Sequence, residues 1–182
     1  MRFAARILLA GLCVVWFTGC GTKLGPKDLE ALEEGAAALE SLGGPDQIVR
    51  MLEALMGELE LGHSEACRKR YAELANSSPD MRSRLAAEIV DSCGVKCPSD
   101  LARLGSMEEA ERWKSILAEC PGGALDGEGL RQNLSAVEYA VLRQLYVVDL
   151  KAALDKDGSE RAKALWPRYD KLLGRLGAAA QH

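Results

Sequence analysis

Apolar residues recur every three or four positions along most of the chain, which is the period of helices that bury one face. The pattern is clearest from residue 45 to residue 59, where Pro45 stands in the first turn and Gly62 lies beyond the end. The sequence has no alternating run of Val, Ile or Thr of strand length. We therefore predict an all-α domain. The apolar stripe of this helix consists of Ile48, Met51, Leu52, Leu55, Met56 and Leu59.

Three further helices are predicted on either side of this one. A narrower stripe predicts a first helix over about 27–42 that stops at two glycines. Two short helices follow at about 64–76 and 79–92, and Ser78-Pro79 opens the second. The narrow stripe consists of Leu29, Leu32, Ala36 and Leu39.

Two capping boxes predict the starts of later helices. Ser106 with Glu109, and Ser135 with Glu138, have the spacing at which each side chain satisfies a backbone donor of the first turn. They predict helix starts near residues 107 and 136. The second start belongs to the longest helix, about 134–155, whose broad apolar face predicts a central, buried position.

Proline and glycine predict two irregularities in the second half of the chain. Residues 121–129 contain five Gly or Pro residues, so we expect a hinge there, between a cysteine-bearing part and a cysteine-free part. A last helix from Ser159 is expected to kink or break at Trp166-Pro167, because proline removes a donor and clashes with the preceding turn. The expected fold is a compact bundle of about seven or eight helices arranged as helical hairpins.

The N-terminus has the build of a secretory signal peptide. Arg2 and Arg6 precede an apolar run over residues 7–17 that is too short to span a bilayer. The run ends in Phe17-Thr18-Gly19-Cys20, which resembles the lipobox of bacterial lipoproteins. The alternative is an uncleaved membrane anchor. Both interpretations place the rest of the chain outside the cytoplasm.

The resemblance to lipoproteins implies a lipid anchor on Cys20. It implies a signal peptide over 1–19, a lipidated cysteine with a short tether over 20–27, and a single helical domain over 28–182. Two or three acyl chains, such as palmitate, hold a protein on a membrane almost permanently. Gly21 stands where Asp would imply retention in the inner membrane. The expected location is therefore the outer membrane, on its periplasmic or its surface face.

The charge of the chain is acidic and unevenly distributed. Without residues 1–19, 21 Lys and Arg oppose 27 Asp and Glu, a net charge of −6, which makes nucleic acid an unfavourable partner. Residues 28–65 carry ten acids against Arg50, whereas residues 159–177 carry five bases against Glu160 and Asp170. Solvated helix faces would explain this pattern. An acidic end that steers a basic partner, or keeps the domain off an anionic membrane, is the alternative.

The sequence gives no catalytic, cofactor or metal signature, so we do not expect an enzyme. Its two histidines are His63 and His182, and the serines lie at caps and turns outside any Gly-x-Ser-x-Gly motif. The Asp155-x-Asp157-Gly158 segment lacks the ligand series of a calcium loop and is interpreted as a turn. Two charged runs, Glu33-Glu34 and Arg68-Lys69-Arg70, are typical of solvated faces.

Four cysteines remain in the predicted mature domain, and an even number in an oxidising compartment favours disulfides. We predict Cys67 with Cys93 and Cys97 with Cys120, because each pair would join the two open ends of a helical hairpin. Periodicity places each sulfur toward the core. The alternatives are a zinc site with four thiolates, whose spacing would be unusual, and a redox-active pair, for which the Cys-x-x-Cys motif is missing.

Two functional hypotheses follow from this build. The favoured one is a membrane-anchored interaction or assembly protein of the cell envelope, whose expected partner is another envelope protein. In general build it is similar to pilotins and to lipoprotein immunity proteins. The alternative is a carrier that binds an apolar ligand between helices, with Met51, Met56 and Met81 as its adaptable lining. Ordinary core filling would explain the same three methionines.

Overall fold

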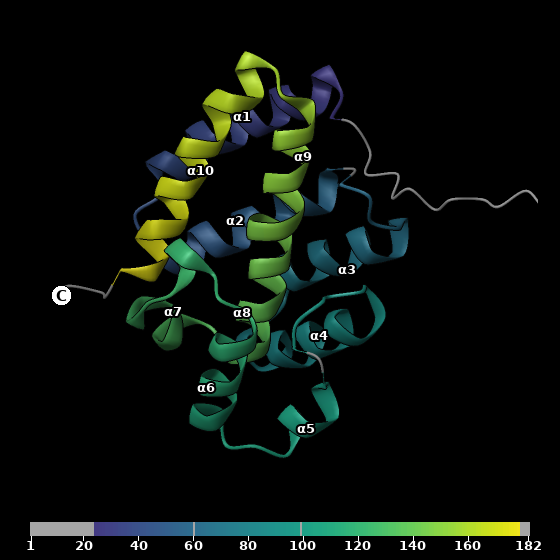
Figure 1. Cartoon of the computed structure of the whole chain (residues 1–182), viewed down its shortest axis with the longest axis vertical. Coiled ribbons are helices and arrows are strands. Elements are labelled where there is room, and N and C mark those ends of the chain that lie inside the picture. The colour runs from purple at the N-terminus through teal and green to yellow at the C-terminus, as the bar shows by residue number, and fades with distance from the viewer. Residues whose placement is uncertain (1–23, 60, 99, 179–182) are drawn as a thin grey trace, which may run out of the picture.

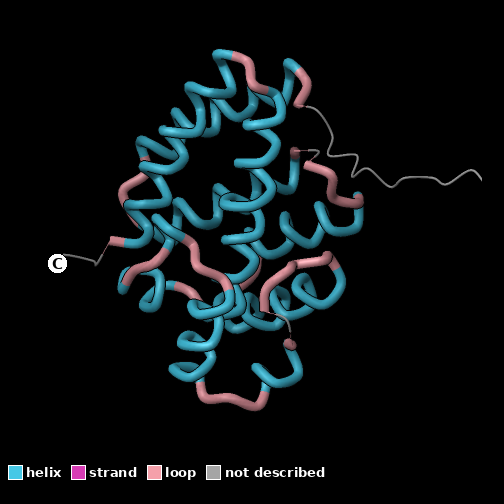
Figure 2. The backbone as a smooth tube through the Cα atoms, viewed as in Figure 1, coloured by secondary structure: helices cyan, strands magenta, loops and turns pink. Residues whose placement is uncertain are grey.

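The all-α prediction is confirmed: every regular element in the described part of the chain is helical (Figure 2). The computed structural model describes residues 24–59, 61–98 and 100–178. Cys20 and the predicted signal peptide lie outside the described residues.

Two antiparallel helices, α1 (Pro26–Ser41) and α2 (Pro45–Glu58), form the first hairpin. Each has proline in its first turn, where the missing N–H costs no hydrogen bond. Gly35 allows the two helices to approach closely, because a Cβ atom there would lie 2.7 Å from a Leu55 methyl carbon. The side of α1 that faces the core is the predicted stripe of Leu29, Leu32, Ala36 and Leu39.

The next pair, α3 (Glu65–Asn76) and α4 (Pro79–Ser92), matches the predicted bounds to within one residue. The Ser64 hydroxyl accepts from the Cys67 amide and so caps the start of α3. Helix α3 packs on α2, and α4 packs on α8 (Ala136–Arg143). The hairpin therefore joins the N-terminal helices to the centre of the molecule.

One continuous helix runs through the centre of the bundle (Figure 1). It consists of α8, a π-helical segment η2 (Gln144–Leu150) and α9 (Lys151–Asp157), and the junction residues keep right-handed helical dihedrals. The predicted capping box of Ser135 and Glu138 opens it. Gly158, with a φ of 65°, closes it. Its buried face carries Val137, Val141, Leu142, Leu145 and Tyr146, which confirms the predicted central position. Val148 and Ala152, predicted on the same face, are half-buried and exposed, respectively.

The other predicted capping box is wrong. Helix α6 (Glu109–Glu119) begins two residues later than expected, after Glu108. Ser106 instead ends a short helix, α5 (Leu101–Gly105), and its hydroxyl donates to the Arg103 carbonyl. The Glu109 carboxylate accepts from the Ala136 amide, so it serves the start of α8, a partner that local spacing could not indicate.

The last helix, α10 (Glu160–Gly177), continues through Pro167 without a break. Pro167 and Lys163 are both exposed, so the carbonyl that loses its helical donor lies on the solvent side. The opposite face packs against the core and keeps the helix intact. Its buried residues are Ala162, Leu165, Tyr169, Leu172, Leu173 and Leu176.

The segment predicted as a hinge packs against α10. It contains a 3-10 turn, η1 (Gly123–Leu125), and the start of α7 (Glu128–Asn133). A Cβ atom on Gly127 would lie 1.5 Å from the Gly177 carbonyl oxygen, so only glycine permits this approach. With the central helix counted once, the described residues form nine α-helices. Helix α5 is the first arm of the hairpin expected between Cys97 and Cys120, whereas the short helix α7 was not expected.

Both predicted disulfides are present. Cys67 and Cys93 join the start of α3 to the end of α4, with 5.7 Å between their Cα atoms. Cys97 and Cys120 join the segment before α5 to the end of α6, with a Cα distance of 5.8 Å. Three of these side chains are buried, as expected, but Cys93 is half-buried.

Candidate functional site

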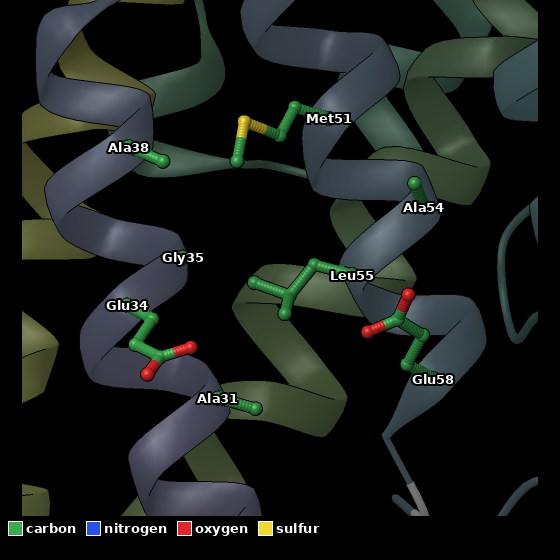
Figure 3. Close-up of a pocket in the computed structure, with 8 residues that line it drawn as sticks. All are labelled: Ala31, Glu34, Gly35, Ala38, Met51, Ala54, Leu55 and Glu58. Atoms are coloured by element: carbon green, nitrogen blue, oxygen red, sulfur yellow. The ribbon is translucent and has the colours of Figure 1, made fainter.

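An apolar groove of about 350 Å³ lies between α1 and α2 (Figure 3). Small side chains let it reach down to the Leu55 side chain, which separates the two helices. On α1 the groove follows positions spaced four and three residues apart, so it runs along the helix axis for about 10 Å. Its lining consists of Ala31, Glu34, Gly35, Ala38, Met51, Ala54, Leu55 and Glu58.

Two carboxylates flank one end of the groove. Glu34 on α1 and Glu58 on α2 lie on opposite sides of Leu55, and both point toward the groove (Figure 3). Both residues are exposed, and neither has a hydrogen bond or ion pair within the described ranges. The groove therefore combines an apolar floor with two negative charges that no described cation neutralises.

The other side of α1 has its charges paired with α10. The Arg161 guanidinium donates to both Glu33 carboxylate oxygens, at 2.8 and 2.7 Å, and Arg168 does the same to Glu40, at 2.8 and 3.0 Å. These hydrogen bonds lower the pKa of Glu33 and of Glu40. The acidic region of residues 28–65 and the basic region of residues 159–177 therefore contact each other through α1 and α10. Glu34 follows Glu33 in sequence but lies on the side of α1 that lines the groove.

A second hollow of about 550 Å³ adjoins the groove and shares Met51 and Ala54 with it. It extends the apolar surface over α2 toward the end of α3. Its remaining lining consists of Leu42, Gln47, Arg50, Ala75 and Asn76. Arg50 donates to the Asp46 carboxylate at 3.0 Å and to the Ser77 carbonyl at 3.3 Å, so its charge is already partnered.

A buried ionic triad connects α2, which forms one wall of the groove, to α4 and α8. The Arg82 side chain donates to both oxygens of Glu53, at 2.9 and 3.0 Å, and to Glu138 at 2.6 Å. The exposed fractions are 4% for Arg82, 1% for Glu53 and 5% for Glu138. Arg82 also donates to the Leu74 carbonyl, so the same guanidinium connects three helices to α3.

The triad contains one positive and two negative groups, so the single Arg82 cation is shared by Glu53 and Glu138. Burial raises the pKa of Glu53 to about 7, although Arg82 opposes the rise. The second oxygen of Glu138 accepts from the Ser135 backbone amide in the capping box. Local spacing in the sequence does not indicate the triad, since Arg82 and Glu53 lie 29 residues apart.

His63 is held in place by Asp149 and Tyr71. Its Nε2 atom lies 2.9 Å from an Asp149 carboxylate oxygen, and its ring meets Tyr71 edge-on with 5.2 Å between the ring centres. The other Asp149 oxygen accepts from the side-chain amide of Gln144. This arrangement attaches the start of α3 to the central helix. Within the described ranges, no three His, Cys, Asp or Glu side chains are placed to hold a metal ion.

The three methionines proposed as a ligand lining lie apart. Met51 lines the groove, Met56 is fully buried in the core, and Met81 is 44% exposed. The Asp155-x-Asp157-Gly158 segment, interpreted as a turn, is the C-terminal end of α9: Asp155 and Asp157 are helical and Gly158 is the left-handed cap. The Asp157 carboxylate accepts from the Ser159 backbone amide. No helix in the described part of the chain is both long and apolar enough to span a bilayer.

Comparison with known proteins yields no match to any protein-family model, curated protein or solved structure.

Proposed function

We propose that this chain is a lipid-anchored protein of the cell envelope that binds a partner protein in the groove between α1 and α2. The observation that carries the proposal is the groove itself: an apolar floor beside two carboxylates that no cation of the described residues neutralises. Buried apolar surface supplies affinity in protein interfaces, and charges at the rim guide the encounter.

The position of the groove suits a partner at a membrane surface. Helix α1 begins at Pro26, and six residues, 20–25, separate it from the end of the predicted signal. Six extended residues span about 20 Å at most. A lipid on Cys20 would therefore keep the groove close to the membrane that holds the lipid.

The anchoring part of the proposal is tested by labelling cells with a fatty acid. Wild-type protein should incorporate the label and fractionate with membranes, whereas Cys20→Ala should remain unlabelled and either leave the membrane or accumulate as precursor. Unlabelled mature protein that begins at Cys20 would contradict the lipid anchor.

The docking part is tested by photo-cross-linking in intact cells. A photoreactive residue in place of Ala38, at the edge of the groove, should capture one specific envelope protein. Ala54→Trp, which fills the groove, should abolish that product while the amount of protein stays unchanged. An identical cross-link in the filled variant would contradict docking in the groove.

A further inference from the structure

We infer that the occupant of the α1–α2 groove is a cationic amphipathic helix of the partner, with small apolar residues on one face and Lys or Arg beside them. This inference deepens the proposed function and rests on it. A helix is inferred because both walls are helices that present positions one turn apart. The ridge of a third helix fits between two such rows.

The small residues of the lining set how close the partner can come. Ala31, Gly35 and Ala38 on α1, with Ala54 on α2, place no long side chain in the groove above Leu55. A helix with Ala or Gly opposite them could approach to the 8–10 Å typical of packed helices. The α1 row spans two turns, so about two to three turns of the partner suffice.

The charge of the occupant follows from the partners of the surrounding acids. Helix α10 neutralises Glu33 and Glu40, and Arg50 neutralises Asp46, but Glu34 and Glu58 have no cation in the described part of the chain. Both point toward the groove from opposite walls. A Lys or Arg above Leu55 would meet two carboxylates, whereas an acidic helix would meet repulsion.

Nuclear magnetic resonance titration of the mature protein tests this chemistry. The probe is an amidated helical peptide of about 14 residues with Ala and Leu on one face and two Lys one turn apart at its border. Amide shifts should map to residues 31–38 and 51–58. A matched peptide with Glu in place of both Lys should bind at least about tenfold more weakly.

Paired variants separate the charge from the fold. Glu34→Gln with Glu58→Gln should weaken the basic peptide about tenfold and remove most of the salt dependence, whereas Glu111→Gln on α6 should change neither. Equal binding of both peptides, or shifts elsewhere on the surface, would overturn the inference. Dodecanoate that binds the groove more tightly than the basic peptide would also overturn it, in favour of an acyl chain.

The failures of the two proposals are distinguishable. A partner cross-linked from Ala38 that lacks a cationic helix would overturn this inference and leave groove docking intact. Peptide binding without any cellular cross-link from Ala38 would overturn the proposed function and leave the chemistry of the groove intact.

Discussion

The two ends of the molecule are stabilised in different ways. At one end, α1, α2 and α10 are long helices that bury five, six and six residues. At the other end, α5 buries Leu104, and α6 buries Trp113 and Ile116. The second end has a disulfide across it, between Cys97 and Cys120, and the first has no cysteine in its helices.

The difference indicates why the groove can remain open. Short helices with little buried area need a covalent link, because burial alone contributes too little free energy. Helices α1 and α2 are held by burial on their inner faces and by charge pairs with α10. Their outer faces are therefore available for a partner. Glu34 and Glu58, which have no cation partner among the described residues, lie there.

The largest expected effect comes from breaking the buried triad between the two ends. Arg82→Met leaves two buried carboxylates without their cation and should lower the free energy of unfolding by about 3–5 kcal/mol, measured by urea denaturation. Arg84→Met, on an exposed position of the same helix, is the matched control and should leave the midpoint nearly unchanged. Equal effects of the two variants would show that the triad does not connect the helices.

Removing the Cys97–Cys120 disulfide should have the next largest effect. Its 23-residue separation predicts a loss of about 3 kcal/mol when both cysteines are replaced by serine. Hydrogen exchange should show faster opening of α5 and α6, while α1 and α2 keep their protection. Uniform loss of protection over all helices would contradict the separate stabilisation of the two ends.

Glu53 should make stability depend on pH in a defined window. Its pKa is about 7 in the folded state against 4.5 for the ordinary group, so the native state retains a proton that the unfolded state has released. The free energy of unfolding should therefore fall as pH rises from about 4.5 to about 7, by at most about 1.4 kcal/mol per pH unit. In Glu53→Gln this decline should vanish. A decline that persists would assign it to another group.

The smallest effect is expected from the charge pairs between α1 and α10. Both guanidinium groups lie at the surface, where salt screens them and solvation offsets the attraction. Arg161→Gln with Arg168→Gln should leave the urea midpoint nearly unchanged at 0.5 M salt. A large shift under these conditions would show that charge pairing, and not burial, holds this end together.

Local signals in the sequence predicted much of the fold. Pro45, Ser78-Pro79 and the capping box at Ser135 act within one turn of the helix, so the bounds of α2, α4 and α8 follow from them. The disulfide pairing also follows from local topology, because each bond closes one hairpin.

The candidate site depends on contacts that the local pattern does not contain. Glu53 lies among the apolar residues of α2, but its partners Arg82 and Glu138 belong to other helices. The groove arises from the packing of α1 against α2, and the sequence cannot show that Glu33 is paired while Glu34 is not. Within the acidic run, Glu33 and Glu40 pair with α10, Asp46 and Glu53 pair with Arg50 and Arg82, and Glu34 and Glu58 line the groove.

The central claim is that the partner docks at the α1–α2 end and not at the α5–α6 end. Its most direct test compares photoreactive residues at Ala38 and at Ala118, an exposed alanine on α6, in the same cells. The account predicts one specific protein cross-linked from Ala38 and none from Ala118. Cross-linking of that protein from Ala118 with equal or greater yield would contradict it.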